Sequence, residues 1–142
     1  MAQLRLELLV SRVAQNAQVL IDHGATVEVF NQDNATPLFF AAAHGHVKIV
    51  QLLLENGARI DRKQRSGITV LSVAAGEGHL DVVKVLIDSS AVVDERLEDD
   101  TTALSVACEN GHVEAARLLL ERGANVNVTL QEDVTPLIAA SA

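Results

Sequence analysis

Residues 36–54 read TPLFFAAAHGHVKIVQLLL, and this stretch decides the fold. Thr36 is a typical N-cap residue, and Pro37 needs no amide partner at a first helical position, so the two predict a short helix. Gly45 interrupts that helix. The apolar residues within 47–54 cover more than one helical stripe, so the second helix must pack on two sides. The stretch therefore predicts one helix-turn-helix unit.

The unit recurs with a period of 33 residues. A Thr stands two residues before a Leu, a Gly-His pair follows, and a glycine near the end of each unit supplies the positive φ that terminates the second helix. Polar residues then predict an extended loop. A unit this small leaves apolar helix faces uncovered, so it is stable only when neighbours stack on it. The markers are Thr36, Thr69, Thr102 and Thr135; Gly45, Gly78 and Gly111; and Gly24, Gly57 and Gly123, with Ser90 in the remaining slot.

These residues resemble the ankyrin repeat, whose pattern runs Gly-x-Thr-Pro-Leu-His, Ala-Ala, Gly-His, a Leu-rich helix and Gly-Ala-Asp-Val-Asn. The resemblance covers nearly the whole chain. It implies an all-α fold, an ankyrin-repeat solenoid of stacked helix-turn-helix units with hairpin loops. We expect a single domain over 1–142, with a degenerate N-terminal repeat at 1–30, full repeats at 31–63, 64–96 and 97–129, and a partial repeat at 130–142.

The sequence departs from the family pattern at three slots. The family's histidine after Thr-Pro-Leu is absent, so its local hydrogen bonds must be lost or remade. Val70 and Ala103 replace proline, so we expect two first helices to begin less sharply. Ser90 either tolerates a strained positive φ or ends its helix differently, and we expect local loosening there. The residues in the histidine slot are Phe39, Ser72, Ser105 and Ile138.

Composition narrows the class of protein. The 142 residues are 49% hydrophobic and only 2% aromatic, which suits one core of small aliphatic side chains. A net charge of −8 repels phosphate backbones and anionic head groups, so we expect no nucleic-acid partner. No uninterrupted apolar stretch approaches membrane-spanning length, so we expect no membrane insertion. The run 4–10 is too interrupted for a signal peptide. Cys108 is the one cysteine, so it cannot form an internal disulfide, and we interpret it as a small core residue. We therefore expect an intracellular protein, cytoplasmic or nuclear. We also expect a monomer.

The sequence carries no pattern that predicts catalysis or metal binding. His46, His79 and His112 fall in successive units about 10 Å apart, too far for one zinc ion, and we expect them to orient turns through backbone hydrogen bonds. His44 and His46 lack a Cys or carboxylate partner nearby. The acidic run 94–100 lacks the alternating ligands and central glycine of a calcium loop. No phosphate loop, nucleophile elbow or zinc-protease motif occurs, so we expect no enzyme, cofactor or metal.

The resemblance implies that another protein binds at the loop tips and the concave face of the first helices. The tip at 61–65 is basic and that at 94–100 acidic, which predicts a partner with complementary patches, unless both are ordinary solvated loops. Phe30 is the expected hot spot, and Phe39 and Phe40 either join it or fill gaps between helices. The implied surface is Phe30, Gln32, Asp33, Ala35, His44, Lys63, Arg65, Ser66, Ile68, Glu77, Arg96, Glu98, Asp99, Thr101, Glu109, Asn110, Gln131, Glu132 and Val134.

Two other functions fit the sequence. The chain resembles an array cut from a longer protein, so it is alternatively a regulatory segment of a larger enzyme or channel that binds intramolecularly. Leu119 lies eight residues before Asn127, with Val126 between them, and this resembles ankyrin sites modified by asparaginyl hydroxylases. Asn127 is therefore either a candidate hydroxylation site or a purely structural residue.

Overall fold

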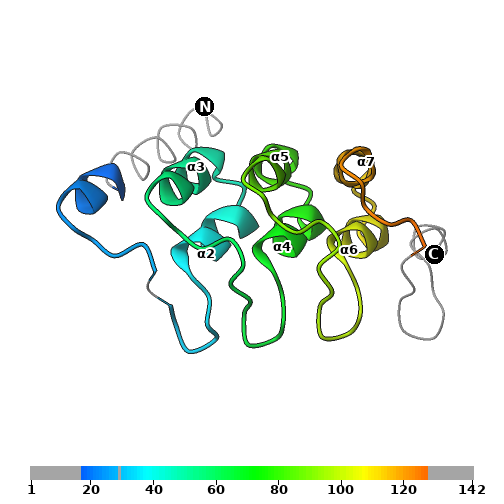
Figure 1. The fold of residues 1–142 in the computed structure, drawn as a ribbon, viewed down its shortest axis with the longest axis horizontal. Coiled ribbons are helices and arrows are strands. Elements are labelled where there is room, and N and C mark those ends of the chain that lie inside the picture. Colours follow the sequence, from blue (N-terminus) through cyan, green and yellow to red (C-terminus); the bar gives the residue numbers. More distant parts are fainter. Residues whose placement is uncertain (1–16, 29, 128–142) are drawn as a thin grey trace, which may run out of the picture.

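The computed structural model describes residues 17–28 and 30–127 and consists of stacked helical hairpins (Figure 1). The inner helices are α2 (Pro37–Ala43), α4 (Val70–Gly76) and α6 (Ala103–Glu109). The outer helices are α3 (Val47–Glu55), α5 (Leu80–Asp88) and α7 (Val113–Glu121). Residues 17–22 are helical too. Figure 1 shows the inner and outer helices as two parallel rows, with the long hairpin loops extending beyond the inner row.

All-α architecture is therefore confirmed. Within the described residues the only β pairing is an isolated antiparallel bridge between Lys63 and Thr69. No helix in this part of the chain is long and apolar enough to cross a bilayer. We call the surface formed by α2, α4, α6 and the hairpin loops the inner face; it corresponds to the concave face expected from the sequence.

Each inner helix begins directly after a threonine. The Thr36 hydroxyl accepts a hydrogen bond from the Phe39 amide at 3.3 Å, and Thr69 and Thr102 cap α4 and α6 in the same way. At α4, the Ser72 hydroxyl also accepts a hydrogen bond from the Thr69 amide at 3.1 Å, which completes a capping box. The expectation that helices without proline begin less sharply is wrong, because capping replaces what proline would supply.

Serine in the histidine slot remakes local hydrogen bonds. Besides its bond to the Thr69 amide, Ser72 donates its hydroxyl to the Thr69 carbonyl at 3.0 Å. The hydroxyls of Ser105 and Thr102 lie 3.2 Å apart. Both serines are buried, and their hydrogen bonds keep these polar groups satisfied in the core.

Ser90 ends α5 in the way that glycine ends its neighbours. Its φ is +74°, beside +88° at Gly57 and +92° at Gly123. The Ala91 amide then donates to the Leu86 carbonyl at 3.0 Å, and the equivalent bonds that close α3 and α7 have the same length. Ser90 thus adopts the strained conformation, and the expected loosening is wrong for these hydrogen bonds.

The core runs continuously through the stack and consists of aliphatic side chains. Leucines and valines from both helix rows meet there, and alanines allow the inner helices to pack closely. Cys108 is half-buried against this core, as expected for a small core residue. Burial, followed by the nearby Glu109 carboxylate, raises the pKa of the Cys108 thiol. Among the described residues, the fully buried leucines are Leu38, Leu86, Leu104 and Leu119.

Histidine of one repeat packs on glycine of the repeat before it. The Nε2 atom of His79 lies 2.9 Å from the Ala43 carbonyl oxygen, and the ring covers Gly45. At the next junction, the equivalent carbonyl of Gly76 accepts a hydrogen bond from the Asn110 side chain at 2.9 Å. The expectation that these histidines bond to backbone is confirmed for His79.

Candidate functional site

A groove of about 290 Å³ lies on the inner face between α4 and α6. Val73 and Val106 occupy equivalent positions on the two helices, and both contribute to its floor. Ile68 and Leu97, from the hairpins that precede the helices, form its apolar wall. All four side chains are half-buried, so apolar surface remains open to a ligand.

Gly76 lines this groove where α4 packs against α6. The residue is buried, and a Cβ atom built on it would lie 2.7 Å from Cγ1 of Val106. Ala43 and Glu109 occupy the equivalent positions on α2 and α6. Glycine therefore allows α4 and α6 to approach each other, because Val106 occupies the space that a side chain at residue 76 would need.

Predicted site residues form the polar rim of the groove. Glu77, Asp99, Glu109 and Asn110 all line it, and all are exposed. Glu109 is the last residue of α6, Glu77 and Asn110 directly follow α4 and α6, and Asp99 lies on the hairpin before α6. Their placement agrees with the surface implied by the family resemblance, and partner binding at them stays a prediction.

Asp99 is fixed in position by Thr101. Its Oδ1 atom accepts hydrogen bonds from the Thr101 hydroxyl at 2.6 Å and from the Thr101 amide at 3.1 Å. The hydroxyl bond is the main reason that the pKa of Asp99 lies below its ordinary value, although burial acts in the opposite direction. The carboxylate is therefore oriented and ionised at neutral pH.

Phe40 extends the apolar row of the groove toward the N-terminus. It occupies the same position in α2 as Val73 in α4 and Val106 in α6, and 47% of it is exposed. Phe39 is only 8% exposed and packs in the core. The alternative that both phenylalanines only fill gaps is right for Phe39 and wrong for Phe40.

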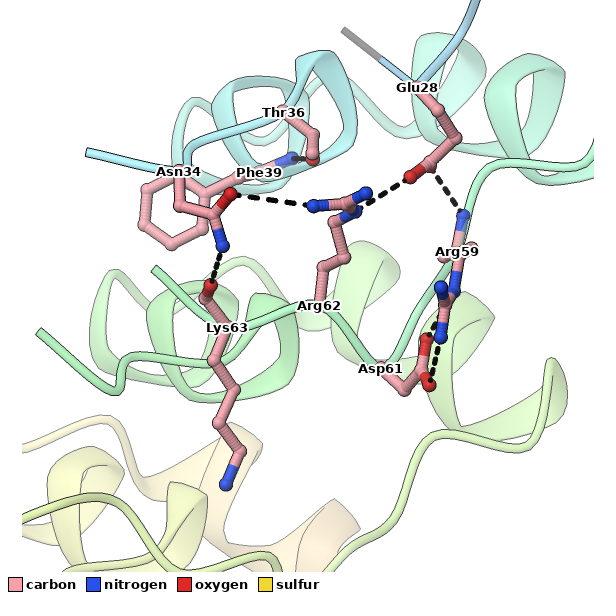
Figure 2. Close-up of polar contacts among 8 residues, drawn as sticks. All are labelled: Glu28, Asn34, Thr36, Phe39, Arg59, Asp61, Arg62 and Lys63. Carbon is pink, nitrogen blue, oxygen red and sulfur yellow. Dashed lines mark hydrogen bonds and ion pairs between the residues drawn. The ribbon is translucent and has the colours of Figure 1, made fainter. Parts of the chain in front are cut away.

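Phe30 stands next to a network of inter-repeat contacts. The residue is 58% exposed, and the Arg62 guanidinium carbon lies 4.8 Å from its ring centroid, which is cation–π geometry. Figure 2 shows the Arg62 side chain reaching between two other groups: its Nε atom lies 2.9 Å from Oε2 of Glu28, and its guanidinium donates to Oδ1 of Asn34 at 3.4 Å. Phe30 therefore has one face in contact with Arg62, and its role as a hot spot stays a prediction.

The basic and acidic tips neutralise each other in part. The Nζ atom of Lys63 lies 2.8 Å from Oε1 of Glu95 and donates to the Arg96 carbonyl at 3.3 Å. The Nη1 atom of Arg96 lies 3.5 Å from Oδ1 of Asp100, and this ion pair is more exposed than that of Lys63 and Glu95. Arg65 is exposed at its tip, and its backbone amide donates to the Asp33 carbonyl at 2.8 Å. The hairpin tips are therefore not simply one basic patch and one separate acidic patch.

The remaining predicted residues have mixed environments. Gln32, Asp33, Ser66 and Glu98 are exposed on the hairpins, whereas Ala35 is buried, so its assignment to the surface is wrong. The described residues contain no group of three His, Cys, Asp or Glu side chains that suits a metal ion. The other predicted positions, Gln131, Glu132 and Val134, lie outside the described residues.

His44 and His46 lie together in the turn between α2 and α3. Their rings stack with centroids 6.0 Å apart, and Nδ1 of His44 lies 2.9 Å from the Phe40 carbonyl oxygen. His44 is exposed and occupies the position equivalent to Glu77 and Asn110. It therefore marks the N-terminal end of the polar rim.

Asn127 lies at the end of the described residues. Its side chain is exposed, and its backbone amide donates to Oδ1 of Asn125 at 2.9 Å. Leu119 is completely buried. An enzyme that contacts both side chains would need the end of α7 to unfold, and hydroxylation of Asn127 stays a prediction.

Comparisons with known proteins agree with the repeat geometry. A family model described as ankyrin repeats (3 copies) matches residues 9–64 and 61–130. A search of curated proteins finds no significant match. The two matched ranges cover well over half of the 142 residues. The chain belongs to the ankyrin-repeat family.

Proposed function

We propose that this chain is a protein-recognition module that binds its partner with the inner face and the hairpin tips. Ankyrin repeats generally serve as protein–protein interaction modules and are typically non-catalytic. The observation that supports this use of the inner face is its apolar row, Phe40, Val73 and Val106, which remains partly open to solvent beside charged rim residues. An apolar centre with a polar rim is typical of protein interfaces.

The module would act by binding alone. Recognition requires no cofactor and no catalytic step, and we place it inside the cell, in the cytoplasm or nucleus. Binding to a preformed surface keeps the ordering cost low, because the rigid inner helices hold the row in place. The chemistry of the rim then decides which partner is accepted.

The outer helices offer the main competing surface. Val113 is 63% exposed on α7, and Leu80 and Leu120 are also exposed on this side. Scattered exposed apolar residues are ordinary on protein surfaces, but a partner on this side would overturn the proposal. A useful experiment must therefore compare the two surfaces directly.

Two variants with the same chemistry test the proposal. The inner variant carries Phe40→Ala, Glu77→Lys and Glu109→Lys, and the outer variant carries Val113→Ala, Glu114→Lys and Glu121→Lys. All six parent residues are exposed. Each variant and the parent would be used to capture proteins from cell lysate, with quantification by mass spectrometry after circular dichroism and urea unfolding show comparable folding.

We expect the inner variant to lose partners that the parent and the outer variant both retain. Purified partner would then be titrated against all three chains, and the inner variant should bind at least about tenfold more weakly, since hot-spot truncation costs more than about 1 kcal/mol. Loss of the same partner by the outer variant alone would place recognition on the outer helices and refute the proposal.

A further inference from the structure

The groove between α4 and α6 combines an apolar floor with a rim in which hydrogen-bond acceptors predominate. Glu77, Asp99 and Glu109 supply carboxylates. The Asn110 side-chain nitrogen donates one of its two N–H groups to the Gly76 carbonyl at 2.9 Å, and the side-chain oxygen is a further acceptor at the rim. Among residues 17–28 and 30–127, no Lys, Arg or His lines the groove, so these residues give the rim a negative charge.

This combination matches one kind of side chain. A ligand that fits must cover Val73 and Val106 with apolar surface and present several donors to the rim. An arginine meets both demands, because its methylene stem packs on apolar groups and its planar guanidinium offers five donors. A lysine ammonium is more strongly hydrated and lacks the planar fork, so it gains less from the apolar floor.

We infer that the groove selects a segment of a partner protein in which an arginine stands between apolar residues. The inference rests on the proposed function and adds the chemistry of the partner. The arginine would lie over Gly76, with its guanidinium between Glu77 and Glu109, and the flanking apolar side chains would cover Ile68 and Leu97. We choose arginine as the occupant because its positive charge is complementary to the acidic rim.

The test uses three blocked pentapeptides, Ala-Leu-Arg-Leu-Ala and its analogues with citrulline or lysine in the central position. Citrulline has nearly the same shape as arginine but no charge. Each peptide would be titrated into the ¹⁵N-labelled full chain at low salt, and the amide signals of Gly76 and Glu77 and the side-chain amide of Asn110 would report occupancy of the groove.

Two charge-removing variants make the result specific. Glu77→Gln with Glu109→Gln removes the two carboxylates between which the guanidinium would lie and leaves Asp99 charged, and Glu114→Gln with Glu121→Gln removes the same charge from α7, where both residues are exposed. These replacements keep side-chain shape, and the parent-like spectrum of each variant would show that it folds.

We expect the arginine peptide to bind about fivefold more tightly than the citrulline peptide, the size of an exposed charge interaction. The ratio should fall to about one in the rim variant, stay unchanged in the α7 variant, and shrink as salt is added. The lysine peptide should bind more weakly than the arginine peptide.

Three results would overturn the inference: equal binding of the arginine and citrulline peptides, equal binding of arginine and lysine, or no saturable shift at Gly76, Glu77 and Asn110 with any peptide. These failures are separate from failure of the proposed function, because the capture experiment detects recognition by the inner face whatever the partner's chemistry.

Discussion

The imidazole ring of His79 lies directly over Gly45 of the preceding repeat. A Cβ atom on residue 45 would stand 2.6 Å from Nδ1 of His79, while Nε2 of the same ring lies 2.9 Å from the Ala43 carbonyl oxygen. Gly45 also has a φ of +74°, which favours glycine. The Gly-His pair is therefore an element of the junction between repeats as well as a turn within one.

Replacing glycine at this junction should cost more than replacing it where no histidine follows. Gly45→Ala and Gly111→Ala both place alanine at a φ of +74°, but a Cβ at Gly111 meets nothing within 4 Å among the described residues. We expect Gly111→Ala to lower the free energy of unfolding by about 1 kcal/mol, and Gly45→Ala by about 1 kcal/mol more, because it displaces His79. Urea unfolding of both variants checks this; equal losses would contradict it.

Ser90→Gly should stabilise the chain. Ser90 has a φ of +74°, and its side chain is exposed, so glycine removes backbone strain without opening a cavity. We expect the free energy of unfolding to rise by about 0.5–1 kcal/mol. The neighbouring Ser89 has a φ of −93°, and Ser89→Gly is the control. Ser89→Gly should not raise the free energy of unfolding, because it only increases the conformational entropy of the unfolded chain. Similar effects of the two changes in thermal unfolding would refute the explanation.

Arg62 should couple energetically to Glu28 across a repeat boundary. Their side chains are 27% and 22% exposed, compared with 61% for each member of the Arg59–Asp61 pair. A double-mutant cycle with Arg62→Met and Glu28→Gln should give a coupling energy of about 0.5–1 kcal/mol. The same cycle with Arg59→Met and Asp61→Asn should give less, because solvent screens the exposed pair. Equal coupling in urea unfolding experiments would show that burial does not strengthen the first pair.

The positions of the helices could be predicted from the sequence because local chemistry fixes them. Thr36 and Pro37 begin α2, and Gly57 ends α3, where the repeat places them. The sequence did not predict the capping role of Ser72. It shows that α4 lacks the proline that favours a helix start, but it does not show the side-chain hydrogen bonds of the capping box. Propensity alone could not reveal a hydrogen bond that compensates for it.

The environment of individual surface residues could not be predicted as well, because it depends on contacts between repeats. Phe39 and Phe40 are adjacent in a short, apolar helix, so periodicity does not show which of them faces the core. Lys63 belongs to a basic stretch, yet its ammonium lies 2.8 Å from Glu95 on the next hairpin. Charge along the sequence thus gives the composition of each tip but not the charge that a partner meets.

The Thr101 hydroxyl should control the titration of Asp99. Because its hydrogen bond lowers the folded-state pKa of Asp99 below the ordinary value of 3.8, this carboxylate stabilises the fold above that pH. The contribution is lost as pH falls through the lower, folded-state pKa. Thr101→Val removes the hydroxyl and should bring the pKa of Asp99 back toward the ordinary value, so that the difference in stability between parent and variant shrinks on acidification. Thr101→Ser keeps a hydroxyl and should restore the low pKa. Carbon-13 NMR titration of the Asp99 carboxyl group measures all three proteins, and an unchanged midpoint in Thr101→Val would show that backbone hydrogen bonds, not the hydroxyl, set this pKa.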